Sequence, residues 1–148
     1  STADPFALHW SLYPRHYVAP RVQGKPPIID GNIEKSEWQA VPFSSAFDEI
    51  RGKEDAPPGT RPSQSCMTRF KMMWDDDFLY ICGLIESDFR VIANFTHRNE
   101  PIFQKDSDFE VFLDPLGSCH NYKELELNAI NTVWNLMWDK PYVSTSYM

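Results

Sequence analysis

The sequence predicts an all-β protein, specifically an antiparallel β-sandwich. Two observations support this fold class. Short segments in which apolar and polar residues alternate recur along the chain, separated by turn residues, while helical spacing is rare. The chain also has 148 residues, of which 42% are hydrophobic and 24% are charged, as is typical of one soluble domain with a sizeable core.

Residues 1–27 are rich in proline and aromatic residues. This composition excludes a regular helix or a central strand and predicts a leader that packs on the domain. The domain itself is predicted over 28–148. It begins with a turn and a short helical turn over 28–38, followed by a strand over 41–50. A polar loop rich in proline and glycine is predicted over 51–65.

The clearest β-hairpin is predicted over 67–87, with the three aspartates at 75–77 forming its turn. The unbroken apolar run after this turn predicts a strand that is covered on both faces. After a long polar connection, further strands are predicted over 106–115, 122–130 and 131–142. Short strands separated by turns are the pattern of a β-sandwich.

Two of these strands carry carboxylates at their centres. Because side chains alternate along a strand, Glu110 shares a side with Asp108, and Glu126 shares a side with Asn128. If the strands pair, one sheet face combines carboxylates, an amide and aromatic rings: Glu110, Glu124, Glu126, Asn128, Phe112 and Trp134. Sugars need this mixture, because rings stack on their C–H faces and carboxylates or amides bind their vicinal hydroxyls. The residues therefore predict a non-catalytic carbohydrate-binding face.

Four stretches resemble, in the same order, the family 9 carbohydrate-binding modules: IDGNIEKSEW, RFKMMWDDDFLYICGLIES, DSDFEVFLDPLGSCHNYKELELNAINTVWNL and KPY. The resemblance covers about residues 28–142. It implies a β-sandwich that holds the reducing-end sugar between two tryptophans, with polar residues on the hydroxyls and structural calcium ions. By position, it implies that Glu110 and Asn128 contact the sugar.

The sequence departs from this family at three positions. Phe103 stands near the first sandwiching tryptophan, and Glu126 stands where the family has an arginine. The second tryptophan would lie in strands beyond Met148, so the sandwich is expected to lack its final strands. Either a partner chain, a second copy or the leader completes it, or processing has removed the final strands. These departures support an alternative function, in which a structural or assembly protein docks a partner chain and has lost sugar binding.

Simpler structural roles stay open for the same residues. Glu110 could pair with Lys71 or Arg69 across the sheet. Asn128 could cap its own backbone in a turn. Phe103 and Trp134 are the ring candidates of the predicted site.

Calcium is a further candidate ligand. Its expected ligands are the acidic turn residues Asp75 and Asp77 and the pair Asp106 and Asp108, although the spacing does not match an EF-hand.

Several function classes are disfavoured. The net charge of −7 and the lack of a basic run argue against a nucleic-acid partner. No apolar run is long enough to insert in a bilayer. The four histidines lack the spacing of a zinc site. An enzyme is not predicted, because nothing in the pattern raises the pKa of one acid in a pair such as Glu110 and Glu126.

The sequence also favours a secreted, extracellular protein. The triplet NFT makes Asn94 a glycosylation acceptor, and a chain that begins at Ser1 has the look of a processed form. The three cysteines, Cys66, Cys82 and Cys119, leave at least one free thiol if every pairing stays within the chain, and their oxidation state is open.

Overall fold

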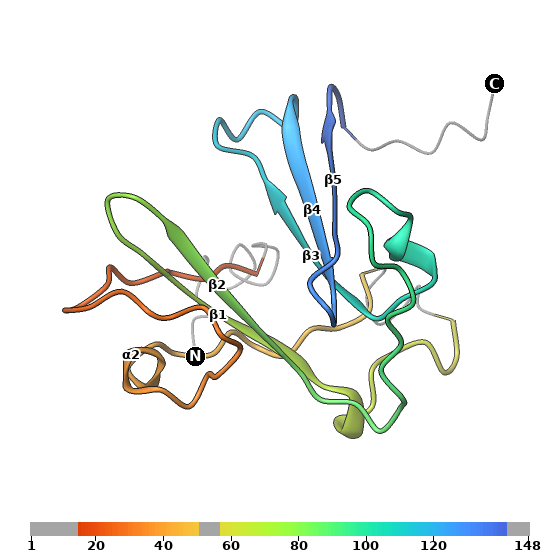
Figure 1. The fold of residues 1–148 in the computed structure, drawn as a ribbon, viewed down its shortest axis with the longest axis horizontal. Helices are drawn as coiled ribbons and strands as arrows, with labels where there is room; N and C mark the ends of the chain where they lie inside the picture. The colour runs from red at the N-terminus through yellow and green to blue at the C-terminus, as the bar shows by residue number, and fades with distance from the viewer. Residues whose placement is uncertain (1–14, 51–56, 142–148) are drawn as a thin grey trace, which may run out of the picture. The chain divides into compact units, whose positions relative to one another are not determined.

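The structure, a computed structural model, describes residues 15–50 and 57–141. These residues form five β-strands in two antiparallel sheets, with one short α-helix and two 3-10 turns (Figure 1). The predicted all-β class is therefore confirmed. The chain divides into two compact units, Ser1–Ser87 and Asp88–Met148, which we call the N-terminal unit and the C-terminal unit and describe separately. The face-to-face packing of a sandwich stays a prediction.

The N-terminal unit is built around the predicted hairpin. Strand β1 (Thr68–Trp74) pairs antiparallel with β2 (Leu79–Ile85) over its whole length. The turn between them is fixed by the carboxylate of Asp75, whose Oδ1 accepts the backbone N–H groups of Asp77 and Phe78 at 2.9 and 2.8 Å. The hairpin prediction and its aspartate turn are therefore confirmed.

Part of the predicted leader lies along the outer edge of β1. The Trp74 N–H donates to the Pro20 carbonyl at 3.1 Å, and the Val22 N–H donates to the Trp74 carbonyl at 2.8 Å. Arg21 forms an isolated parallel bridge with Trp74. The Tyr17 hydroxyl donates to the Pro42 carbonyl at 2.6 Å. Residues 17–22 thus satisfy one end of the β1 edge without forming a regular strand.

A second segment covers the other end of this edge. The Ser44 N–H donates to the Phe70 carbonyl, and the Phe47 N–H donates to the Thr68 carbonyl, both at 2.8 Å. The strand predicted over 41–50 is nevertheless wrong, because the described residues there have no strand assignment. Ser44 and Phe47, three residues apart, both bond to β1, and the segment follows the edge without a strand assignment.

The core of the N-terminal unit lies under the short helix α2 (Ser36–Gln39). Trp38 projects from this helix and packs with Val41 and Met73, and each of the three is at most 5% exposed. Lys71 is also buried here, with its ammonium donating to the Trp38 carbonyl at 2.8 Å and lying 4.3 Å from the Phe43 ring centroid. The predicted helical turn is therefore present and supplies the main core residue.

Strand β2 differs from its prediction in burial. None of its residues is buried, and Leu79 and Ile85 are 48% and 51% exposed. The expectation that both faces are covered is therefore wrong. An apolar run shows that a strand can be covered, but the covering segments decide whether it is.

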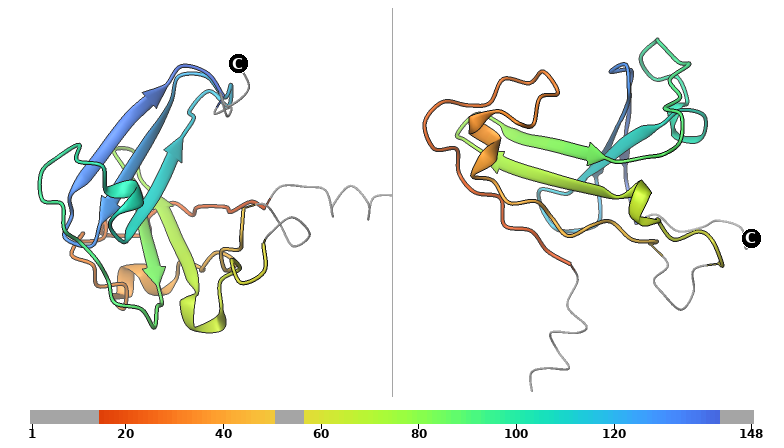
Figure 2. Two further views of the ribbon diagram at one scale, coloured as in Figure 1. Left: turned by 90° about the vertical axis from the view of Figure 1, so that its right-hand side faces the viewer. Right: turned by 90° about the horizontal axis from the view of Figure 1, so that it is seen from below.

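The C-terminal unit contains a three-stranded antiparallel sheet with β4 at its centre (Figure 2). Its strands are β3 (Asp108–Leu113), β4 (Tyr122–Asn128) and β5 (Val133–Trp138). In register, Glu110 lies opposite Glu126, and Glu126 lies opposite Trp134. Strand β4 buries Glu124, Glu126 and Asn128, whereas its leucines are only half-buried. The polar side of the central strand is thus its buried side.

Candidate functional site

The three-stranded sheet gathers a set of polar residues on one face. The register pairs Asp108 with Asn128, Glu110 with Glu126 and Phe112 with Glu124. The acidic side chains therefore share a face, as the alternation along both strands predicts. We call this surface the acidic face, and it consists of Asp108, Glu110, Glu124, Glu126 and Asn128.

Exposure differs sharply within the acidic face. Glu110 is exposed, whereas Glu126 is 2%, Asn128 5% and Glu124 8% exposed. The expectation that Glu126 and Asn128 face solvent is therefore wrong. Glu126 lies on the central strand between neighbours on both sides, and the segment before β3 covers Asn128. Only Glu110 of the predicted sugar-contacting pair is open to a ligand.

Asn128 has a structural role that uses its whole amide. Its Nδ2 donates to the Phe95 carbonyl at 3.0 Å and to Asp106 Oδ2 at 2.8 Å. Its Oδ1 accepts the N–H groups of Ile130 and Thr132 at 3.2 and 2.8 Å. Two donors and two acceptor positions are the full capacity of a side-chain amide. The turn-capping alternative is the one that the structure shows, and no polar atom of Asn128 remains for a sugar.

The turn that Asn128 caps joins β4 to β5. Asn131 donates its N–H to the Asn128 carbonyl at 3.0 Å and adopts a left-handed φ of 67°. A left-handed residue is common at the end of a short hairpin loop, and Asn tolerates this conformation better than most residues. The turn holds β5, and with it Trp134, in register beside Glu126.

Asp106 does not fit its predicted role as a calcium ligand. Its carboxylate accepts the N–H groups of Asn94 and Phe95 at 2.8 and 3.1 Å, besides the amide of Asn128. Burial acts to raise the pKa of Asp106, but these hydrogen bonds outweigh it and leave the pKa below its usual value. The carboxylate therefore fastens the segment before β3 to the end of β4.

The acidic turn of the hairpin is explained in the same way. Asp75 accepts the Tyr80 hydroxyl at 2.7 Å in addition to its two backbone bonds, and these contacts lower the pKa of Asp75. Asp77 is exposed. The turn geometry accounts for the Asp75 carboxylate, whereas Asp77 contributes only its backbone N–H to the turn.

Aromatic rings stand at two ends of the acidic face. Phe103, which is 40% exposed, lies 5.2 Å from Trp134 between ring centroids. At the other end Phe112, Tyr122 and Trp138 form a chain of rings with centroid distances of 6.3 and 6.4 Å. The structure thus brings the two predicted ring candidates, Phe103 and Trp134, together.

The electrostatics of the acidic face are unusual. Burial, followed by the charges of Glu110, Asp108 and Glu124 and a hydrogen bond with Glu124, raises the pKa of Glu126 to about 8. Burial and neighbouring carboxylates also raise the pKa values of Glu110 and Asp108. Among residues 88–141 none of these acids has a Lys or Arg within 4.0 Å. The sequence argument that no acid here has a raised pKa is therefore wrong, because β4 buries its polar side.

Three of these carboxylates also form a group that could hold a metal. One oxygen from each of Asp108, Glu110 and Glu126 lies within 4.8 Å of the others. Asp108 Oδ2 and Glu126 Oε2 are buried and have no hydrogen-bond partner. Of the four predicted calcium ligands, only Asp108 belongs to this group. The signal for the group was present in the sequence, because Asp108 and Glu110 are two residues apart on one strand.

The structural alternative for Glu110 named two basic partners, and both are engaged in the N-terminal unit. Lys71 donates to the Trp38 carbonyl, and Arg69 lies 3.8 Å from Glu86. Asn94, the predicted glycosylation acceptor, is exposed. No disulfide joins any two of Cys66, Cys82 and Cys119.

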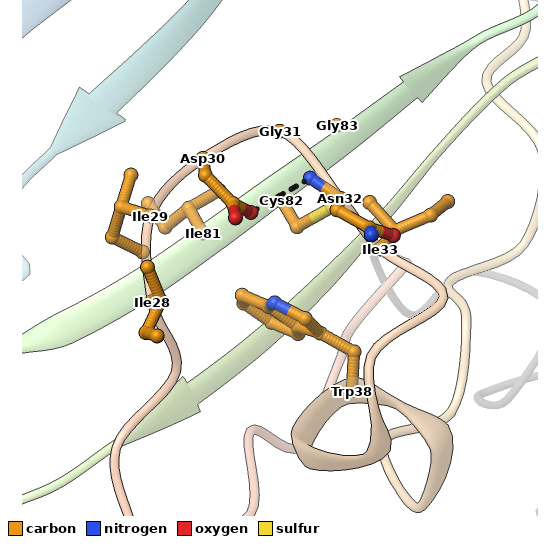
Figure 3. A pocket seen from close by; sticks show the side chains of 10 residues that line it. All are labelled: Ile28, Ile29, Asp30, Gly31, Asn32, Ile33, Trp38, Ile81, Cys82 and Gly83. Atoms are coloured by element: carbon orange, nitrogen blue, oxygen red, sulfur yellow. Dashed lines mark hydrogen bonds between the residues drawn. The ribbon is translucent and has the colours of Figure 1, made fainter.

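The N-terminal unit has a pocket of about 180 Å³ beside its core (Figure 3). Ile28, Ile29 and Ile33 line it, and the Trp38 ring points into it from α2 (Figure 3). The Asp30 carboxylate at its rim accepts the Asn32 N–H at 3.1 Å and pairs with Lys35. The Asp30 carboxylate is therefore already engaged by Asn32 and Lys35. We interpret the pocket as the open rim of the hydrophobic core.

In the described part of the chain, no helix combines the length and apolar character needed to cross a bilayer. No family model matches the sequence, and neither a curated protein nor a solved structure matches it. The resemblance to the family 9 modules therefore stays a prediction that rests on the sequence motifs.

Proposed function

We propose that this chain is a non-catalytic carbohydrate-binding protein of the family 9 type, a β-sandwich that holds a saccharide at the open part of its acidic face. Glu110 accepts hydrogen bonds from the sugar hydroxyls, and Phe103 and Trp134 provide the stacking surface. The observation that carries the proposal is the shared face of an exposed carboxylate and a pair of rings.

The spacing of these groups supports the proposal. Glu110 on β3 and Trp134 on β5 both lie opposite Glu126 on β4. Neighbouring strands are about 4.8 Å apart, so the two positions are separated by about 10 Å. One sugar ring that lies across the Glu126 position can donate a hydrogen bond to Glu110 on one side and make a ring contact with Trp134 on the other. Asn128 acts in this site by holding the β4–β5 turn and does not touch the sugar.

The proposal includes a setting for the protein. We place it outside the cell, with Asn94 as a glycosylation site, since that residue is exposed. Mass spectrometry of the protein purified from a secreting eukaryotic host tests this point. A sugar-sized mass increment that is lost in Asn94→Gln is expected, and its absence in the secreted protein contradicts the assignment.

An enzyme remains a poorer choice despite the raised pKa of Glu126. Such a pKa suits a general acid, but an acid must reach the bond that it protonates. Glu126 is 2% exposed and faces its neighbours on β3 and β5. Incubation with oligosaccharides should therefore leave them intact, and released reducing ends would contradict the non-catalytic proposal.

The binding test uses the full chain on a glycan array, followed by calorimetric titration of the best ligand. Glu110→Gln and Trp134→Ala should each weaken binding by about tenfold or more, because a lost charged hydrogen bond or stacking ring costs about 1–3 kcal/mol. Asp139→Asn, an exposed acid beyond β5, is the matched control and should bind normally. A folded sample that binds no saccharide would end the proposal.

One observation favours the alternative function, a structural protein that docks a partner chain. Large apolar side chains of the N-terminal unit are exposed, among them Ile29 at 71%, Phe78 at 64% and Ile85 at 51%. Apolar groups left in water often mark an interface. Light scattering after size-exclusion chromatography tests self-association. A stable dimer supports this alternative, and a monomer at high concentration speaks against docking of a second copy.

A further inference from the structure

We propose that Asp108, Glu110 and Glu126 bind one hard divalent cation of the Ca²⁺ class, held between β3 and β4. The proposal goes beyond saccharide binding and does not depend on it. The three side chains come from adjacent positions of one strand pair, with Glu110 directly opposite Glu126 and Asp108 two residues before Glu110. A regular sheet therefore presents the ligands without any special loop.

The distances fit a single ion. Ca²⁺ binds oxygen at about 2.3–2.6 Å, so two oxygens on one ion can lie up to about 5 Å apart. The oxygens of Asp108, Glu110 and Glu126 lie within 4.8 Å of one another. Each carboxylate can bind through one or two oxygens, and Glu110 is exposed, so water can complete the six to eight ligands that Ca²⁺ takes.

Two carboxylate oxygens of this group are buried without a hydrogen-bond partner, and among the described residues the one other carboxylate of this kind, Asp114 at its Oδ1, lies outside the group. Glu126 is 2% exposed, and its Oε2 has no hydrogen-bond partner. The Oδ2 atom of Asp108 is also buried and has no hydrogen-bond partner. A buried polar atom without a partner costs about 1–3 kcal/mol, and more if it is charged. Asp106, in contrast, has its hydrogen bonds filled by the backbone and by Asn128. The unpartnered oxygens therefore point to a missing ligand.

A divalent cation compensates the unpartnered oxygens and the negative charge of these carboxylates better than a single proton does. A proton on Glu126 can be shared with Glu124, which leaves Glu126 Oε2 and Asp108 Oδ2 without partners. The acids of this face also have no basic partner within 4.0 Å among residues 88–141. One divalent ion contacts both orphan oxygens and offsets two negative charges at once.

The ligand chemistry selects the class of ion. All three ligands are carboxylates, with no histidine or cysteine in the group. Zn²⁺ and copper favour nitrogen and sulfur ligands, whereas Ca²⁺ favours oxygen. Mg²⁺ demands a tighter octahedron and releases its water reluctantly. An irregular, partly open set of carboxylates suits Ca²⁺ best.

The test titrates Ca²⁺ into the metal-stripped full chain by calorimetry, without any sugar, and follows thermal unfolding in parallel. We expect one ion per chain with a Kd of about 1 mM or tighter, and a Tm that rises with Ca²⁺ concentration. NaCl at matched ionic strength is the control for simple screening. No heat of binding at millimolar Ca²⁺, or an equal stabilisation by NaCl, would overturn the proposal.

Variants assign the site. Glu126→Gln and Asp108→Asn should each weaken Ca²⁺ binding at least tenfold, while Asp139→Asn should leave it unchanged. Two independent ligand variants keep the test decisive if one of them folds poorly. Trp134→Ala should lose sugar binding but keep Ca²⁺ binding, so a failure of the saccharide proposal is distinguishable from a failure of this one. Unchanged Ca²⁺ affinity in both ligand variants would place the ion elsewhere and refute the site.

Discussion

Replacing Glu126 by glutamine should stabilise the metal-free protein at neutral pH. Burial and the charges of Glu110, Asp108 and Glu124 raise the pKa of Glu126 from 4.5 to about 8. Between these two pH values the folded chain keeps a proton on Glu126 that the unfolded chain has lost. Raising the pH through this window therefore destabilises the folded state, by up to about 1.4 kcal/mol per pH unit. The favourable contribution is complete below the unfolded pKa and is lost by the time the folded pKa is passed.

The magnitude follows from the size of the shift. At neutral pH most of the window has been crossed, so ionisation of Glu126 in the unfolded chain lowers the free energy of unfolding by about 2–4 kcal/mol. Glutamine has nearly the same shape and does not titrate, so the variant should recover this amount. The gain should shrink towards zero near the unfolded pKa of 4.5, where the parent is protonated in both states.

The assay is urea unfolding followed by tryptophan fluorescence, at a series of pH values and with a chelator present. The difference in unfolding free energy between Glu126→Gln and the parent should grow as the pH rises. Asp139→Asn, which changes an exposed acid, should run parallel to the parent. Parallel curves for the parent and Glu126→Gln across the whole window would refute the reasoning, because they would mean that Glu126 titrates alike in both states.

Three further predictions follow from buried or exposed groups. Asn128→Ala should lower the free energy of unfolding by about 2–4 kcal/mol in chemical denaturation, because it leaves backbone N–H groups of the β4–β5 turn without their acceptor. An unchanged denaturation midpoint would contradict the turn-capping role. Trp38→Ala should cost about 3–5 kcal/mol in the same measurement, since Trp38 is 3% exposed in the core, and a loss below about 1 kcal/mol would speak against that packing. Iodoacetamide should modify exposed Cys119 faster than Cys82, because burial raises the pKa of the Cys82 thiol. Mass spectrometry of the labelled peptides measures the two rates, and faster labelling of Cys82 would contradict its burial on β2.

The sequence was a good guide to which residues share a strand face. Period-two alternation requires Asp108 and Glu110 to lie on one side of β3, and Glu126 and Asn128 on one side of β4, whatever the rest of the fold. The hairpin around Asp75 was equally visible, because acidic turn residues separate two apolar runs. These features depend on local geometry alone.

The sequence could not show which face of the sheet is covered. Alternation on β4 places its leucines and its polar residues on opposite sides, and the structure buries the polar side, with Glu124, Glu126 and Asn128, more deeply. This burial depends on long-range contacts, such as the bonds from Asn128 to Phe95 and Asp106, which no local pattern encodes. The same limit explains why the sequence argument missed the raised pKa of Glu126.

Trp74 donates its N–H to the Pro20 carbonyl and accepts the Val22 N–H, and these two bonds bear on how the chain can be shortened. Trimming at residue 28, where the motif resemblance begins, would strip one end of β1 of its backbone partners. An uncovered strand end invites strand addition by other molecules, and hence precipitation. Fragments intended for biophysical work should therefore start before Tyr17. Loss of solubility in a shorter fragment would then reflect the absence of residues 17–22 from the β1 edge and not an intrinsic instability of the hairpin.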